Sequence, residues 1–130
     1  MLENNNLILI DGKPATYKSS LGISILNSSN KKCCYIDLEG NKHIPINNNI
    51  KVYNGIDDID NYINENDIIL IDYIEILNYS IEDIIKLKGL VDNANKTLIL
   101  ISCCSSNKNL FNDNYNRLKE ISDLVLTTDK

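Results

Sequence analysis

Five short, nearly continuous apolar runs constrain the fold of this chain more than any other feature of its sequence. Each run is four to six residues long, which is too short and too uniformly apolar for an amphipathic helix. Such runs are typical of strands that are buried on both faces of a parallel sheet. The predicted strands are Leu7 to Asp11, Cys33 to Leu38, Ile68 to Asp72, Thr97 to Ser102 and Leu124 to Thr127, with a weaker edge strand at Lys51 to Tyr53.

Segments with a helical spacing of apolar residues separate the predicted strands. In the segment from Lys18 to Leu26, Leu21 and Ile25 fit a helix that packs one face on the sheet. The alternation of strands and helices predicts an α/β domain with a buried, mostly parallel sheet. The other predicted helices are Asp57 to Ile63, Ser80 to Asn93 and Leu110 to Glu120.

The predicted helix from Ser80 to Asn93 has a clear start signal. Ser80 is the expected N-cap, and Asp83 lies three residues further on, where a capping box needs an acceptor. The residues expected to pack inward are Ile81, Ile84, Ile85 and Leu87.

Composition limits the classes of function. The chain has 130 residues, an apolar fraction of 43% and a formal net charge of -5, and Arg117 is its only arginine. We therefore expect a single domain over residues 1–130, without the broad positive face that binding to a nucleic-acid backbone requires. No apolar run reaches membrane-spanning length and the start of the chain lacks a basic signal, so an intracellular, soluble protein is expected, in the cytoplasm or in a host cell if the chain is viral.

The four cysteines form two adjacent pairs, Cys33 with Cys34 and Cys103 with Cys104. Neither pair has the two-residue spacer of a zinc or thioredoxin-type motif. We interpret them as buried, reduced thiols on strands.

The first predicted strand runs into a glycine turn and then into Lys-Ser-Ser at a helix start. Gly12, Lys18 and Ser19 have the spacing of a phosphate-binding loop, but Tyr17 stands where that pattern has its second glycine. Backbone N–H groups of such a loop and the helix N-terminus bind phosphate, while the lysine neutralises the terminal phosphates. The alternative is a strand-turn-helix whose lysine and serines face solvent. The predicted nucleotide-binding residues are Gly12, Lys13, Pro14, Ala15, Thr16, Tyr17, Lys18, Ser19 and Ser20.

An aspartate follows four apolar residues in the run from Ile68 to Asp72. This is the form of the second motif of a nucleoside triphosphatase, in which the carboxylate holds Mg²⁺ on a strand near the loop. An aspartate at a strand end also forms turns, which is the alternative. The sequence thus predicts Ser19 and Asp72 as metal ligands, with ATP and Mg²⁺ as the cofactors.

Three segments together resemble a known family. The stretches from Gly12 to Ser20, from Tyr35 to Gly40 and from Ile71 to Leu77 are similar to the RecA-type P-loop ATPase core, and the third is especially similar to replicative DnaB-type helicases. The resemblance covers nearly all of the chain. It implies a three-layer P-loop NTPase with a RecA-like, mostly parallel five-stranded sheet, in the strand order 5-1-4-3-2, flanked by helices.

The resemblance also implies a catalytic residue. Glu39, at the end of the second predicted strand, matches the acid that positions and deprotonates the attacking water in RecA-type enzymes. Many other phosphate-loop ATPases carry this glutamate directly after the magnesium aspartate, where this chain has Tyr73. The alternative is that Glu39 is only a loop residue before a turn at Gly40.

Other positions depart from the family pattern. Tyr17 replaces a glycine where other residues pay a conformational cost, and Cys103 falls where the family commonly has a glutamine that senses the γ-phosphate. The chain ends at Lys130, whereas helicase relatives continue into a segment that supplies a basic finger to the neighbouring subunit. The segment from Ser105 to Asn116 takes the place of a DNA-contacting loop but offers one cation, Lys108.

The resemblance implies an ATP-binding protein that is a weak or partner-dependent ATP hydrolase in DNA replication, recombination or repair. The alternative is a catalytically inactive RecA-fold module that uses nucleotide only as a structural ligand or switch. The expected partners are nucleotide and other protein chains, or copies of this chain, with weak contact to DNA and none with a membrane.

Overall fold

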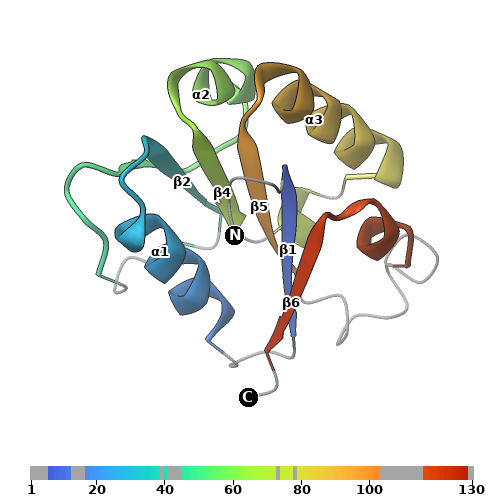
Figure 1. Cartoon of the computed structure of the whole chain (residues 1–130), viewed down its shortest axis with the longest axis horizontal. Helices are drawn as coiled ribbons and strands as arrows, with labels where there is room; N and C mark the ends of the chain where they lie inside the picture. Colours follow the sequence, from blue (N-terminus) through green and yellow to red (C-terminus); the bar gives the residue numbers. More distant parts are fainter. Residues whose placement is uncertain are drawn as a thin grey trace.

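A six-stranded, entirely parallel sheet forms the centre of the protein (Figure 1). The computed structural model describes residues 6–12, 17–38, 40, 45–72, 74–77, 79–102 and 116–128. In the sheet the strands follow the order β3-β2-β4-β5-β1-β6. Their bounds are β1 Leu7–Gly12, β2 Cys33–Asp37, β3 Lys51–Tyr53, β4 Ile68–Asp72, β5 Thr97–Ser102 and β6 Leu124–Thr128.

The predicted α/β class and parallel sheet are confirmed, and so is the order of the five main strands, β6-β1-β5-β4-β2. The weaker edge strand predicted at Lys51 to Tyr53 is confirmed as β3, which pairs with β2. The five-stranded sheet that the resemblance implies is wrong, because β3 makes a sixth strand. β3 lies at an edge and two of its three residues are exposed. An edge strand buries little side-chain surface, so its sequence carries a weaker apolar signal than the central strands.

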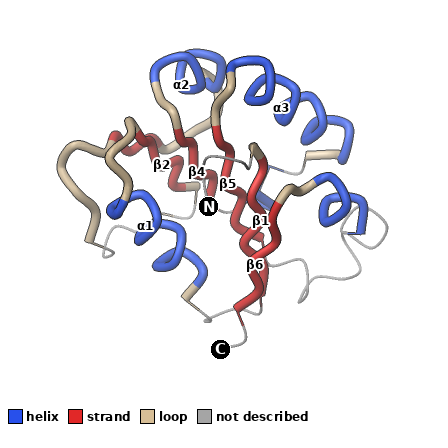
Figure 2. Tube along the Cα trace, viewed as in Figure 1, coloured by secondary structure: helices blue, strands red, loops and turns tan. Residues whose placement is uncertain are grey.

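Three of the four predicted helices are found near their predicted places as α1, α2 and α3 (Figure 2). α1 begins at Lys18 as predicted, and α2 is shifted by two residues towards the C-terminus relative to its prediction. The fourth predicted helix, Leu110 to Glu120, is helical over residues 116–121, and its earlier part lies outside the described residues. The bounds are α1 Lys18–Ser28, α2 Ile59–Glu65 and α3 Ile81–Ala94, with a short 3₁₀ helix, η2, at Ile74–Leu77.

The capping box of α3 is confirmed. The backbone N–H of Ser80 donates to Asp83 Oδ2 at 3.0 Å, and the backbone N–H of Asp83 donates to Ser80 Oγ at 3.2 Å. The inward face holds Ile81, Ile84, Leu87 and Val91. The prediction that Ile85 packs inward is wrong, since it is 40% exposed. Ile85 is one residue after Ile84 and is therefore turned about a quarter of the way around the helix.

Helices cover both faces of the sheet. Ile23 and Leu26 of α1 pack with alternate strand residues such as Ile8 and Ile10. The residues between them, such as Leu9, pack in a second cluster with α2, α3 and Leu118. Burial on both faces explains why the strands read as continuous apolar runs. In the described part of the chain, no helix has the length and apolar character needed to cross a membrane.

Helix α1 lies very close to the sheet at Gly22. A Cβ atom placed on Gly22 would lie 3.1 Å from Leu70 Cδ2 and 3.1 Å from Ile101 Cδ1. Gly22 comes three residues after Ser19, so both residues lie on the face of α1 that is turned to the sheet. The missing side chain at Gly22 therefore lets the start of α1 approach the ends of the central strands.

We expect Gly22→Val to destabilise the fold by about 1–3 kcal/mol, because a larger side chain forces Leu70 and Ile101 out of their packing. Urea unfolding measures the loss. The matched control is Ser24→Val, which puts the same side chain at an exposed position of α1. Equal stability of the two variants would show that α1 does not pack as closely as described.

Candidate functional site

Buried polar side chains gather at the carboxyl edge of the sheet. Asp11 on β1, Asp37 on β2, Asp72 on β4 and Ser102 on β5 are each the last or next-to-last residue of their strand, and all four are buried. The neighbouring strands β1 and β5 are followed by helices on opposite faces of the sheet, α1 after β1 and residues 116–121, which include the buried Leu118, after β5. Open α/β sheets bind ligands outside the carboxyl ends of two neighbouring strands whose connections leave on opposite faces of the sheet.

Strand alternation divides these polar residues between the two faces. Tyr35 packs in the α1 cluster, and Asp37 follows two residues later on the same side of β2. Asp37 pairs in register with Asp72 of β4, so Asp72 also lies on the α1 side. Asp11 pairs in register with Ser102. Each of them lies two residues after a side chain that packs in the α3 cluster, Leu9 and Leu100 respectively. The start of α1 therefore faces Asp72 rather than Asp11.

Ser19 and Asp72, the two predicted metal ligands, are in direct contact. The hydroxyl of Ser19, the second residue of α1, donates to Asp72 Oδ2 at 2.6 Å. The two residues are 53 positions apart in the chain. The fold thus places a hydroxyl from the helix start beside a carboxylate from the third predicted strand.

Tyr35 joins this pair, although nothing in the sequence assigned it a role. Its hydroxyl donates to the same oxygen, Asp72 Oδ2, at 2.7 Å, and the hydrogen bond is buried. Strand alternation is the sequence signal that could have pointed to it. Tyr35 lies two residues before Asp37, and therefore on the same face of a strand that was expected to run beside the strand of Asp72. A tyrosine in that buried position needs a partner for its hydroxyl.

Lys18 begins α1 and is 7% exposed. Within the described helix α1, the first turn holds no acidic residue and no side chain caps it. The partial positive charge of the helix N-terminus is therefore not offset by a carboxylate of the helix itself, and the Lys18 ammonium adds a full charge. Such a helix start favours a bound anion.

The other predicted loop residues are placed only in part. Gly12 is the last residue of β1 and Ser20 is an exposed residue of α1. Lys13, Pro14, Ala15 and Thr16 lie outside the described residues.

Tyr17 has the conformation that favours glycine. Its backbone is left-handed, with φ 64° and ψ 31°, and its side chain is 75% exposed. The carbonyl of Tyr17 accepts a hydrogen bond from the backbone N–H of Leu21 at 3.0 Å, so Tyr17 is the N-cap of α1. A non-glycine residue in this region costs about 1–2 kcal/mol. Tyr17 thus has the left-handed backbone that the glycine of the family pattern would adopt without this cost.

The turn after β2 is built by Asp37 and Gly40. The backbone N–H of Gly40 donates to Asp37 Oδ1 at 2.7 Å, and Gly40 has φ 83°, which suits glycine. The backbone N–H of Leu38 donates to the carbonyl of Asp72 at 2.7 Å, which ties the end of β2 to the end of β4. Glu39, the predicted catalytic residue, lies outside the described residues, as do Tyr73 and Cys103.

Cys33 and Cys34 are buried, unoxidised thiols on β2, as the sequence predicts. Burial raises the pKa of Cys33, and burial raises the pKa of Cys34 to about 12. A thiol that stays protonated is a poor nucleophile and a poor metal ligand. Cys103 and Cys104 lie outside the described residues.

The donor set around Asp72 suits a hard cation. In the residues that the structure covers, no group of three or more His, Cys, Asp or Glu side chains could hold a metal ion. Mg²⁺ does not need one, because it keeps several waters and takes one or two protein oxygens together with phosphate. The hydroxyl of Ser19 and the carboxylate of Asp72 are oxygens of that kind.

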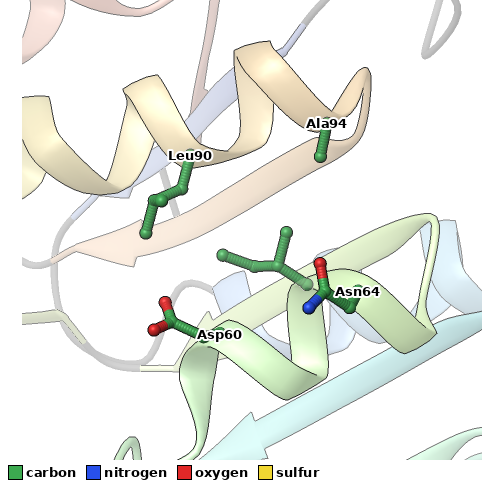
Figure 3. Close-up of a pocket in the computed structure, with 5 residues that line it drawn as sticks. Asp60, Asn64, Leu90 and Ala94 are labelled. Atoms are coloured by element: carbon green, nitrogen blue, oxygen red, sulfur yellow. The ribbon is translucent and has the colours of Figure 1, made fainter.

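A pocket of about 300 Å³ lies elsewhere, between α2 and α3. Figure 3 shows Asp60 and Asn64 on α2 and Leu90 and Ala94 on α3 around it. These helices cover the face of the sheet opposite α1. The pocket is therefore separate from the Ser19–Asp72 contact.

Comparison of the chain with protein-family models and with curated protein sequences finds no match.

We expect Tyr17→Gly to be more stable than Tyr17→Ala by about 1 kcal/mol, because only glycine adopts φ 64° without a Cβ clash. Both variants remove the exposed ring, so their difference isolates the backbone effect. Urea denaturation measures it. A Gly variant that is no more stable than the Ala variant would contradict the left-handed conformation.

Proposed function

We propose that this chain is an ATP-binding P-loop NTPase of the RecA/DnaB-like type, which binds the nucleotide with Mg²⁺ at the start of α1. The observation that carries the proposal is the 2.6 Å hydrogen bond between Ser19 Oγ and Asp72 Oδ2. It brings the serine that follows the loop lysine next to the aspartate that ends an apolar strand. Both motifs were identified separately in the sequence, and a nucleoside triphosphatase needs them together.

The chain's own groups divide the work of binding. The loop from Gly12 to Tyr17 leads into the positive end of α1, where backbone N–H groups favour phosphate. Lys18 neutralises the terminal phosphates of the nucleotide. Ser19 and Asp72 hold Mg²⁺, which when bound offsets the charge of the β- and γ-phosphates.

Hydrolysis in this proposal is weak or depends on a partner. Glu39 serves as the base that deprotonates the attacking water. Arg117 is the only arginine in the chain. Its Nη1 atom lies 3.7 Å from Oε2 of Glu82 on α3, and α3 covers the face of the sheet opposite α1. A cation that stabilises the transferring phosphate must therefore come from a lysine or from another molecule. The same dependence suits a role in DNA replication, recombination or repair that is carried out through protein partners.

A second candidate function is a RecA-fold module that binds nucleotide as a structural ligand or switch without turnover. The left-handed backbone of Tyr17 favours it. Tyr17 holds this conformation at a cost that a glycine would not have, directly before the loop lysine, and an added cost at this point weakens a site that must also bind the transition state.

We expect Lys18→Ala to weaken binding of a fluorescent ATP analogue in Mg²⁺ by about 10- to 100-fold, the range for losing a charge-assisted hydrogen bond. Fluorescence titration measures it. The control is Lys86→Ala, which removes an exposed lysine of α3 and should leave the affinity unchanged. Absence of binding in the wild-type protein, or binding that survives Lys18→Ala, would show that the phosphate site is wrongly assigned.

We expect Glu39→Gln to bind the analogue like the wild-type protein and to lose turnover by about 100-fold or more, because a glutamine cannot accept the proton of water. Phosphate release is measured at high protein concentration, with and without single-stranded DNA. Glu65→Gln, which changes an exposed glutamate of α2, is the control. Unchanged turnover in Glu39→Gln would show that Glu39 is not the base. If the wild-type protein binds the analogue tightly but releases no phosphate, the nucleotide-switch function is favoured.

A further inference from the structure

We infer that Tyr35 is a positioning residue that fixes the carboxylate of Asp72 for its divalent cation. The inference rests on the proposed function and adds a residue to that site. Its basis is the buried hydrogen bond, 2.7 Å long, from the Tyr35 hydroxyl to Asp72 Oδ2.

Tyr35 is a rigid donor. Its side chain is 2% exposed and packs in the apolar cluster between α1 and the sheet. The β2–β4 register aligns Tyr35 with Leu70, so Asp72 follows two residues beyond that pair on the same side of the sheet. A ring held by this packing can direct its hydroxyl only within a narrow range, and that range includes Asp72 Oδ2.

Ser19 is a different kind of donor to the same oxygen. Its hydroxyl is on a short side chain that turns about a single bond, and it is itself a ligand for the cation in the proposed function. A hydroxyl has one hydrogen and two lone pairs, so Ser19 can donate to Asp72 while a lone pair faces the cation, and the position of its Oγ is then set by the cation as well as by the hydrogen bond. Tyr35 is not a ligand of the cation in the proposed function, so its hydroxyl anchors Oδ2 independently of the cation.

Anchoring one oxygen fixes the plane of the carboxylate and so the direction of the other oxygen. Mg²⁺ demands near-ideal octahedral geometry, so a rotated carboxylate lowers affinity for it. Groups that orient metal ligands in this way commonly change metal affinity by about 10- to 100-fold when they are removed. Tyr35 therefore acts on the cation-dependent part of nucleotide binding and not on the part due to Lys18.

The test is Tyr35→Phe, which keeps the ring and removes the hydroxyl. The fluorescent ATP analogue is titrated over a series of Mg²⁺ concentrations and in excess chelator. We expect the Mg²⁺ concentration at half-maximal effect to rise on the order of tenfold, while affinity in chelator stays the same. The matched control is Tyr53→Phe on β3, which removes the hydroxyl of a tyrosine whose ring stacks on that of Tyr62. It should change neither the Mg²⁺ concentration at half-maximal effect nor the affinity in chelator.

A second background separates positioning from a general loss of packing. In Asp72→Asn, which lacks the carboxylate, adding Tyr35→Phe should cause no further shift in Mg²⁺ dependence. Equal weakening with and without Mg²⁺ in Tyr35→Phe, or the same shift in the Asp72→Asn background, would overturn the inference. So would an unchanged Mg²⁺ dependence in Tyr35→Phe. Absence of Mg²⁺-dependent binding in the wild-type protein would instead overturn the proposed function, and this inference with it.

Discussion

Burial of the parallel sheet on both faces is the constraint on which the rest of the structure depends. Each central strand contributes apolar side chains to two clusters, one beneath α1 and one beneath α2 and α3. A polar side chain within such a strand has no solvent on either side and must find a partner. The polar residues therefore collect where the strands end, and because all strands are parallel, these ends meet at one edge.

At that edge, the carboxylate of Asp72 is held by hydroxyl groups from two directions. Ser19 approaches from the helix that follows β1, and Tyr35 approaches from the neighbouring strand β2. A buried carboxylate is costly unless hydrogen bonds compensate for lost hydration. The same oxygens that satisfy this need are those that a hard cation prefers. The structure thus links the stability of the sheet edge to the chemistry proposed for it.

The start of α1 combines a close approach with local strain. Gly22 lets the helix lie against Leu70 and Ile101, which brings Ser19 within reach of Asp72. Tyr17, one residue before the helix, holds a left-handed backbone that glycine would adopt at lower cost. The family-like spacing of Gly12, Lys18 and Ser19 is thus kept in a loop whose entry to the helix is strained.

The sequence by itself determined the order of the elements and the parallel sheet, because burial on two faces leaves a local pattern. It also singled out Ser19, from the loop spacing, and Asp72, from its place after an apolar run. It located β3 only as a weaker strand, because an edge strand leaves little apolar signal. It misplaced Ile85, whose position next to Ile84 turns it off the buried face. Only the tertiary structure decided that Tyr35 reaches Asp72 and that Asp11 faces the other way. Both depend on the register between neighbouring strands, which no local sequence pattern encodes.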